Sequence, residues 1–220
     1  VACRSVMLNT HEARCRVSRV AMSPDILAVR ARNYRMVKRR DKVEETRRRI
    51  AKATYELHST IGPAFTTISL VSERAGLPRQ TVYRNFRTNL DLYRGCIAFG
   101  LETHPLPDAE QWQSITDPGE RLQVGLAELY QWFEATEAVM TNSVRDFGAV
   151  KESAQAMQPV GEIFGRMFAM LFEGLKGGDV AALLSLAMDF ATWKKLHSEH
   201  DMASGAIVEL WSDLIHCRQT

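Results

Sequence analysis

The side chains best suited to bind another molecule lie in one short run, residues 79–85. The run reads Arg-Gln-Thr-Val-Tyr-Arg-Asn, so every side chain except the valine can form hydrogen bonds. Arginine, threonine and tyrosine side chains bind phosphate oxygens, and arginine, glutamine and asparagine pair with base edges in the major groove of DNA. The composition of this run therefore predicts contacts with nucleic acid.

The residues before this run predict the turn that would position it. Apolar side chains recur at three- and four-residue steps at Ile68, Val71 and Ala75, which indicates a short helix. Gly76 follows where that helix must end, because glycine readily adopts the left-handed backbone found at helix ends. Pro78 then stands at the start of a second helix, where a missing N–H costs nothing. The segment is typical of a helix-turn-helix, whose second helix enters the major groove of DNA.

The two parts of the chain carry opposite charge. Residues 1–87 hold 19 Lys and Arg against 7 Asp and Glu, whereas residues 88–220 hold 9 against 19, so the net charge of +2 conceals +12 and −10. A basic surface neutralises phosphates and gives a salt-dependent affinity for DNA. The first part of the chain is therefore expected to face DNA, and the acidic remainder is not.

Residues 1–41 form a basic N-terminal extension without sustained helical periodicity. Two explanations stay open. The extension is a disordered arm that adds non-specific affinity for DNA, or it comes from a mis-assigned start, because Met36 begins Met-Val-Lys-Arg-Arg-Asp-Lys just ahead of the first clear helix. That helix is expected over residues 42–59, where apolar side chains recur seven apart.

The order of these motifs resembles the DNA-binding domain of the tetracycline-repressor (TetR) family of transcription regulators. The resemblance covers about residues 43–95 and rests on Phe-Thr-Thr before the first short helix, Ala-Gly-Leu at the turn, and Tyr83 and Phe86 as a Tyr-x-x-Phe ending. It implies three domains. They are a helix-turn-helix domain over residues 42–88, a linking helix and loop over residues 89–107, and a helical effector-binding and dimerisation domain over residues 108–220.

The same resemblance implies roles for individual side chains. Contacts with phosphates are implied for Thr67, Arg79, Thr81 and Tyr83, and contacts with base edges for Gln80, Arg84 and Asn85. Two positions depart from the family pattern. Pro78 stands where the family often has a capping serine, and Asn89 stands where it often has a lysine that contacts a phosphate. Asn89 can still donate a hydrogen bond to the phosphate but without a charge, which predicts a shallower salt dependence.

The remaining residues predict an all-α protein. Helical periodicity continues from residue 89 to the C-terminus with interruptions, and no segment shows the alternation expected of a strand. After a linking helix over residues 89–102, the expected helices cover residues 118–141, 143–150, 153–175, 179–198 and 204–217.

Small side chains in the penultimate of these helices permit close approach of another helix. They are Ala181, Ala182, Ser185, Ala187 and Ala191. Together with the apolar side of the last helix they resemble the four-helix dimer interface of TetR-family proteins, although both helices would also serve to close the core of one subunit. A homodimer would read a palindromic operator in double-stranded DNA, because two-fold symmetry in the protein matches two half-sites.

Aromatic and methionine side chains concentrate in the middle helices. Such adaptable side chains suit a pocket for a hydrophobic or planar effector, although an ordinary hydrophobic core has the same pattern. The candidate pocket residues are Trp132, Phe133, Met140, Phe147, Phe164, Met167, Phe168 and Trp193. The polar side chains that would orient a ligand are Asn142, Arg145, Asp146 and Asp189.

No pattern in the sequence predicts catalysis, a cofactor or a metal ion. A phosphate-binding loop, a nucleophile elbow and paired carboxylates are all missing, and His197, His200 and Asp201 lack a further ligand at a fixed spacing. The four cysteines include no CxxC pair, and no apolar run approaches the roughly 20 residues that span a bilayer. A reduced, cytoplasmic setting without membrane contact is therefore expected.

The leading hypothesis is a dimeric transcription regulator, most directly a repressor that a small effector releases from its operator. Two alternatives stay open. A helical small-molecule-binding protein or enzyme would retain only a vestigial helix-turn-helix, and a ligand-independent regulator would need no effector site.

Overall fold

The computed structural model of the chain describes residues 24–218, with the side chains of residues 24–33 and 35 left out. Helices make up most of this part, and no β-strand occurs in it, so the expected all-α class is confirmed. Residues 1–23 of the predicted extension lie outside the described residues. The chain divides into two units, residues 1–42 and residues 43–220.

Helix α1 is longer than the sequence pattern predicts. It runs Pro24–Thr60, so it begins at Pro24 rather than near Lys42, and the described part of the extension is helical. Residues 36–42 are all exposed, and they therefore have no apolar stripe for a periodicity search to detect. Good helix formers such as alanine, leucine, arginine, lysine and methionine dominate the segment after Pro24, and their intrinsic propensity explains the helix.

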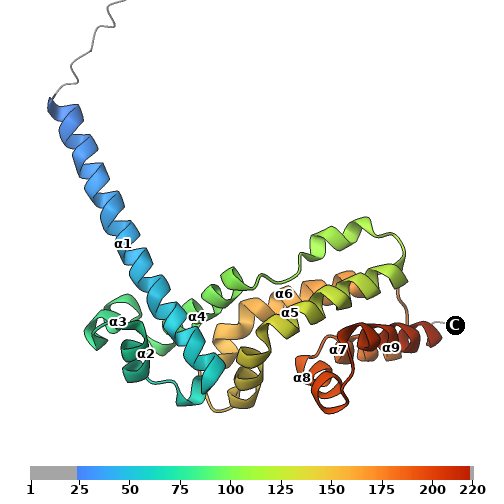
Figure 1. The fold of residues 1–220 in the computed structure, drawn as a ribbon. Coiled ribbons are helices and arrows are strands. Elements are labelled where there is room, and N and C mark those ends of the chain that lie inside the picture. The colour runs from blue at the N-terminus through green and yellow to red at the C-terminus, as the bar shows by residue number, and fades with distance from the viewer. Residues whose placement is uncertain (1–23, 219–220) are drawn as a thin grey trace, which may run out of the picture. The chain divides into compact units, whose positions relative to one another are not determined.

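The second unit begins with the helices that surround the predicted reading helix. Helices α2 (Ile68–Ala75), α3 (Arg79–Asn85) and α4 (Asn89–Thr103) follow the last turns of α1 and a short 3-10 turn, Pro63–Phe65. Figure 1 shows α2 and α3 as the compact pair next to α1. The shared core contains Ile50, Ala53, Leu57, Val71, Val82, Phe86, Leu92 and Phe99.

Two long helices form the framework of the remainder. After a 3-10 segment, Ala109–Ser114, helix α5 spans Pro118–Asp146 and α6 spans Ser153–Phe172; the two run alongside each other (Figure 1). Helix α5 thus runs without the expected break after residue 141, and it ends at Asp146, so residues 147–150 of the expected second helix are not helical. Asp117 begins α5 by accepting a hydrogen bond from the Glu120 N–H at 2.7 Å.

The expected helix over residues 179–198 is interrupted. Helix α7 covers Gly178–Ala187, α8 covers Phe190–Lys194, and a π-helical turn covers Lys195–Glu199. The break lies at Asp189, which caps α8 by accepting a hydrogen bond from the Thr192 N–H at 2.7 Å. Helix α9, Ser204–Cys217, ends the described chain and packs on α5 and α7.

Between residues 24 and 218, no helix is both long enough and apolar enough to cross a membrane.

Candidate nucleic-acid interface and ligand cavities

The turn between α2 and α3 has the backbone geometry that its sequence requires. Thr67 caps α2 by accepting a hydrogen bond from the Leu70 N–H at 3.3 Å. Gly76 lies in the left-handed region, with φ 60° and ψ 41°, and its N–H bonds back to the last turn of α2. The Ser72 hydroxyl then donates to the Leu77 carbonyl at 2.5 Å, which fixes the path of the chain into α3. These bonds set the angle at which α3 leaves the turn.

Helix α3 buries one side and exposes the other. Val82 and the following Phe86 are buried, at 0% and 3% exposure, and anchor the helix against α1 and α2. The predicted DNA-binding side chains Arg79, Gln80, Tyr83 and Arg84 are all exposed, and Thr81 is half-buried. Tyr83 is 55% exposed, although a tyrosine of the core would be covered. The helix therefore presents two cations and several hydrogen-bonding groups to the outside.

Asn85 differs from the other predicted groove-facing residues. Its side chain is half-buried, and its amide N–H donates to the Thr81 carbonyl at 2.7 Å, one turn back on the same helix. This bond leaves the amide oxygen and the second N–H for any contact with a base.

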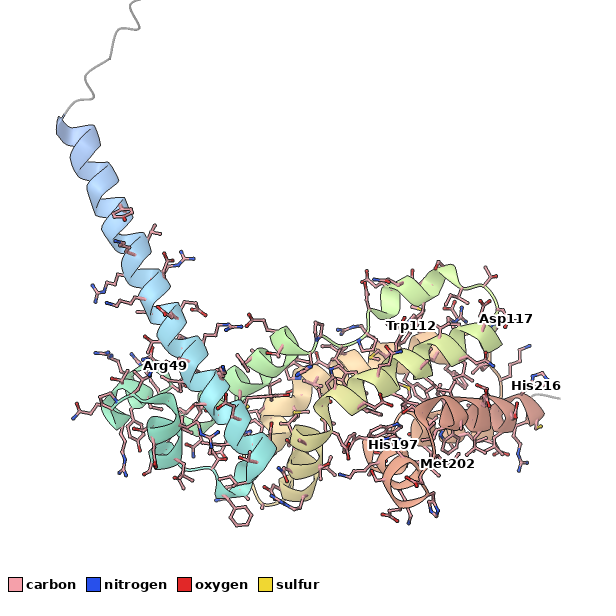
Figure 2. The ribbon with its side chains drawn as sticks, in the orientation of Figure 1. Arg49, Trp112, Asp117, His197, Met202 and His216 are labelled. Carbon is pink, nitrogen blue, oxygen red and sulfur yellow. The ribbon has the colours of Figure 1, made fainter. Side chains whose placement is uncertain are left out.

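Arginines from α1 hold α3 and the turn in place. Arg47 donates to the Asn85 carbonyl, and its guanidinium carbon lies 4.3 Å from the centre of the Phe86 ring. Arg49, labelled in Figure 2, donates to the Gly76 carbonyl at 3.4 Å. A cation near the C-terminal carbonyls of α2 and α3 also complements the dipoles of both helices. These arginines position α3.

The two departures from the family pattern are visible at the starts of α3 and α4. Pro78 occupies the N-cap of α3 and makes no side-chain capping bond. Helix α4 is capped by Thr88 and Asp91, whose side chains bond to each other's backbone N–H groups. Asn89 follows as the first residue of α4, and its exposed amide is not needed for the cap.

A hydrogen-bonded joint connects the end of α5 to the end of α1. The Asn142 amide donates to the carbonyls of His58 and Ser59, both at 2.9 Å. Arg145 donates to the Ile61 carbonyl at 2.9 Å, and Asp146 accepts from the Ala64 N–H at 3.0 Å. The carbonyl groups at a helix C-terminus otherwise lack partners. Three of the side chains predicted to orient a ligand are therefore engaged in this joint, and the fourth, Asp189, caps α8.

Within the joint, Arg145 and Asp146 form an ion pair with an Nε to Oδ1 distance of 2.7 Å. Hydrogen bonding from Arg145 holds the pKa of the Asp146 carboxyl below its usual value, and the Ala64 N–H acts in the same direction. The carboxylate is therefore ionised when it binds the backbone of the 3-10 turn.

An inner cavity of about 80 Å³ lies where α1, α4, α5 and α6 meet. Its lining is largely apolar and includes Ile97, Trp132, Val139, Met140 and Met157, together with the polar His58, Tyr93 and Cys96. Of the predicted pocket residues, this cavity brings together only Trp132 and Met140.

An outer cavity of about 250 Å³ lies beside the inner one, at the N-terminal ends of α2 and α4. Its lining is more polar and includes Thr54, Thr67, Asn89 and Glu152. His58 and Tyr93 line both cavities, so these two side chains form the wall between them. Their rings lie 5.1 Å apart, centre to centre.

His58 and Cys96 are buried at this wall. The His58 Nδ1 lies 3.4 Å from the Cys96 sulfur, and burial lowers the pKa of His58 to about 4, although the charge of Asp146 opposes the shift. Burial also raises the pKa of the Cys96 thiol, which keeps it protonated. Both side chains are therefore uncharged at neutral pH.

The other predicted pocket residues are distributed elsewhere. Met167 and Phe168 line an open groove of about 820 Å³ between α6 and the 3-10 segment at residues 109–114. Phe133 and Trp193 are fully buried core side chains, whereas Phe147 is 50% exposed at the end of α5. The ring of Phe164 packs against that of Trp132, with ring centres 6.1 Å apart. The eight residues do not form one pocket.

The sequence pattern did not identify the residues of the cavity wall. His58 is four residues after the buried Thr54 and eight after the buried Ile50, so all three share one face of α1. Two polar side chains on the core face of an amphipathic helix are uncommon. The position of His58 on the core face of α1 could therefore have identified it in the sequence. A periodicity search that counts only apolar residues overlooks it.

The last helices leave an apolar strip exposed. Leu186 of α7 is 49% exposed, and Leu210 and Leu214 of α9 are 36% and 42% exposed. The small side chains Ala182 and Ser185 are exposed on α7, whereas Ala187 is buried in the core. The face therefore combines exposed leucines with small side chains.

In the part of the chain that the structure describes, no three His, Cys, Asp or Glu side chains gather closely enough to hold a metal ion. His197 instead stacks on Trp193 with ring centres 4.9 Å apart, and its Nδ1 lies 2.8 Å from the Met202 carbonyl oxygen (Figure 2).

Solved structures that superpose on the chain include a metabolic regulator and a repressor. A protein described as a regulator of fatty acid metabolism in Clostridium perfringens superposes with a TM-score of 0.58 at 15% sequence identity, covering 76% of this chain and 96% of that one. Two crystal structures of NalD, the secondary repressor of the MexAB-OprM multidrug efflux pump in Pseudomonas aeruginosa, superpose with TM-scores of 0.55 and 0.56. Their identities are 19% and 21%, and each covers 80% of this chain and 96% of NalD.

At these identities the superpositions establish a shared fold, a helix-turn-helix followed by a larger helical domain. No protein-family model and no curated protein sequence matches the chain.

Proposed function

We propose that the protein is a sequence-specific DNA-binding transcription regulator of the TetR type. The observation that carries the proposal is the exposed polar face of α3, with Arg79, Gln80, Tyr83 and Arg84 outward over the buried Val82. Helix α3 is the second helix of a capped helix-turn-helix, and this helix reads the major groove in such proteins. Residues 43–87, which include α3, hold 8 Lys and Arg against 4 Asp and Glu, and this excess of positive charge also favours DNA.

Within this proposal the side chains have different tasks. Thr67, Arg79, Thr81, Tyr83 and Asn89 bind phosphates, and Gln80, Arg84 and Asn85 contact base edges. Because Asn85 already donates one hydrogen bond to its own helix, its contact uses the remaining groups of the amide.

The regulator acts as a homodimer that binds a palindromic operator, and a small hydrophobic effector releases it. Exposed Leu186, Leu210 and Leu214 support a dimer face on α7 and α9, since a second copy would remove them from water. The joint between α5 and α1 supports coupling, because it connects the helices around the inner cavity to the helix that holds α3. A regulator that an effector releases from its operator blocks transcription while it is bound, so the protein would be a repressor. We place it in the cytoplasm, where the DNA is.

A direct test is binding of a fluorescent random-sequence duplex at several salt concentrations. We expect an affinity that falls steeply with salt, because arginines displace counterions from the phosphates. The Arg79→Ala, Arg84→Ala double variant should bind more weakly and with a shallower salt slope. A parent protein that does not bind DNA even at low salt, while remaining folded, would favour the carrier or enzyme alternative.

A further inference from the structure

Two adjoining cavities with different linings share one wall. The inner cavity is almost entirely apolar, the outer cavity mixes polar side chains with apolar ones such as Leu92 and Val150, and His58 and Tyr93 line both. Their volumes of about 80 and 250 Å³ together reach the lower end of the range, roughly 300–1,000 Å³, that small-molecule sites occupy. An apolar cavity next to a more polar one suits a ligand that has an apolar tail and a polar head group.

The inner cavity suits a short alkyl tail. Ile97, Val139 and Val160 present only hydrocarbon to it, and Met140 and Met157 can adjust to the shape of a guest because their side chains are unbranched and flexible. A volume of about 80 Å³ is smaller than the roughly 150 Å³ of a cavity that holds benzene. The tail is therefore a chain of a few methylene groups rather than a fused ring system.

The outer cavity contains polar groups that lack partners within residues 24–218. The carboxylate of Glu152 makes no hydrogen bond or ion pair, although this residue is half-buried and stands at the N-cap of α6. His58 is 4% exposed, and within residues 24–218 its hydrogen-bond contact is that of Nδ1 with the Cys96 sulfur. A polar group without a protein partner is available to a ligand or to water.

The charge of the lining selects the head group. Glu152 is the only charged residue among those that line the outer cavity, since burial keeps His58 neutral at physiological pH. A lone carboxylate pairs best with a cation that donates hydrogen bonds. An ammonium group has that chemistry, and the hydroxyl oxygens of Thr54 and Thr66, which donate to the Ile50 and Gly62 carbonyls, can accept its further N–H groups.

We propose that the two cavities form a single binding site for a small aliphatic amine, with the alkyl tail in the inner cavity and the ammonium at Glu152 in the outer cavity. The ligand then lies against His58 and Tyr93, the two side chains that line both cavities.

The position of the outer cavity links this ligand to DNA binding, and this step rests on the function proposed above. Thr67, the N-cap of α2, and Asn89, the first residue of α4, line the outer cavity, and both are assigned to phosphates. A ligand that fills this cavity lies against both side chains and displaces them from the phosphates. The amine is therefore the effector that lowers affinity for the operator.

The test uses n-alkylamines from propylamine to octylamine as probes, with the corresponding primary alcohols as matched uncharged ligands. Isothermal calorimetry on the full chain, without DNA, measures the affinity of each. We expect affinity to rise about fourfold for each added methylene until the inner cavity is full, and then to level off. Each amine should bind at least tenfold more tightly than its alcohol.

Two variants separate the two halves of the site. Glu152→Gln should remove the preference for amines over alcohols and keep the dependence on chain length. Val139→Phe should fill the inner cavity and abolish that dependence, whereas Glu162→Gln on the exposed face of α6 is the matched control. Unfolding curves confirm that each variant is folded. Equal affinities for amines and alcohols, or binding unchanged by both variants, would overturn the proposal.

The DNA readout is separate. If the amines bind as expected and octylamine releases a bound duplex from the parent but not from Val139→Phe, both the site and its regulatory role hold. Amine binding without any DNA binding by the protein would refute the proposed function and leave the ligand site intact. DNA binding with no amine binding would refute the ligand site alone.

Discussion

At the scale of single residues, the two arginines of α3 that face outward have separable roles. Arg79 stands in the first turn of the helix and Arg84 in the last, and both are exposed without an ion-pair partner within residues 24–218. A cation that binds phosphate strengthens binding to every sequence, whereas a cation paired with a base edge strengthens binding to one sequence. Substitutions at these two positions should therefore have different signatures.

Arg84→Ala should lower the preference for the operator over a random duplex by roughly 10- to 100-fold, which is the value of one bidentate arginine–guanine contact. Arg79→Ala should instead weaken binding to both duplexes by the same factor and reduce the salt slope by about one. Fluorescence anisotropy with both duplexes measures the effects, and Arg166→Ala in the acidic part is the control. Equal losses on both duplexes from both substitutions would contradict this division of roles.

His58 makes the stability of the protein depend on pH. Its pKa is about 4 in the folded protein, below the usual 6.5, so the unfolded chain takes up a proton in a range where the folded protein does not. The contribution of neutral His58 to the free energy of unfolding is complete above pH 6.5. It is lost as the pH falls toward 4, and the total loss is about 3 kcal/mol.

Urea unfolding at pH 7.0, 5.5 and 4.5 measures this loss. His58→Asn should flatten the decline in unfolding free energy over that range, and His200→Asn, at an exposed position, should not. A decline of the same steepness in the parent and in His58→Asn would show that other groups are responsible.

At the scale of helices, the predictions succeeded where local sequence signals decide the structure. The turn between α2 and α3 followed from Gly76 and Pro78, because left-handed backbone and a missing N–H act on immediate neighbours. The expected break after residue 141 failed because Asn142 bonds to α1 and Asp146 to the following 3-10 turn, and these contacts keep α5 helical to Asp146. Contacts between distant segments leave no local signal.

The candidate site divides in the same way. Six of the eight residues proposed to contact DNA belong to one short helix, so the spacing of buried and exposed positions is readable in the sequence. The cavities collect His58, Tyr93 and Glu152 from three distant segments, and only the fold brings them together. The aromatic and methionine pattern could not distinguish core residues such as Phe133 from lining residues such as Trp132, because both are largely buried.

The joint between α5 and α1 should stabilise the fold measurably. Asn142→Ala removes the donor to the His58 and Ser59 carbonyls and should lower the free energy of unfolding by about 1–2 kcal/mol. Gln131→Ala, on the exposed side of the same helix, should change it by less than about 0.5 kcal/mol. Urea unfolding monitored by circular dichroism compares them, and indistinguishable midpoints for the two variants would show that the joint contributes nothing.

At the scale of the whole molecule, opposite charges and an apolar strip define two different surfaces. The basic first part of the chain suits DNA, and the strip on α7 and α9 suits a second copy of the chain. A dimer that presents two copies of α3 doubles the contacts with bases, and closed two-fold symmetry limits the assembly to two subunits.

Leu210→Glu together with Leu214→Glu should convert a dimer into a folded monomer, because two carboxylates on each side would be buried against each other. Sedimentation velocity measures the mass, and Val144→Glu, an equally exposed apolar position on α5, is the control. Loss of operator binding should accompany loss of the dimer. A parent protein that sediments as a monomer at the concentrations used for DNA binding would contradict the assignment of this face.

The most direct test of the central claim is selection of bound sequences from a pool of random double-stranded DNA at moderate salt. A dimer that reads DNA through α3 predicts enrichment of a palindrome whose two half-sites lie in successive major grooves on one side of the duplex. The Arg84→Ala variant should lose conserved bases in both half-sites at once. Recovery of an unenriched pool by the folded parent protein at low salt would contradict the account.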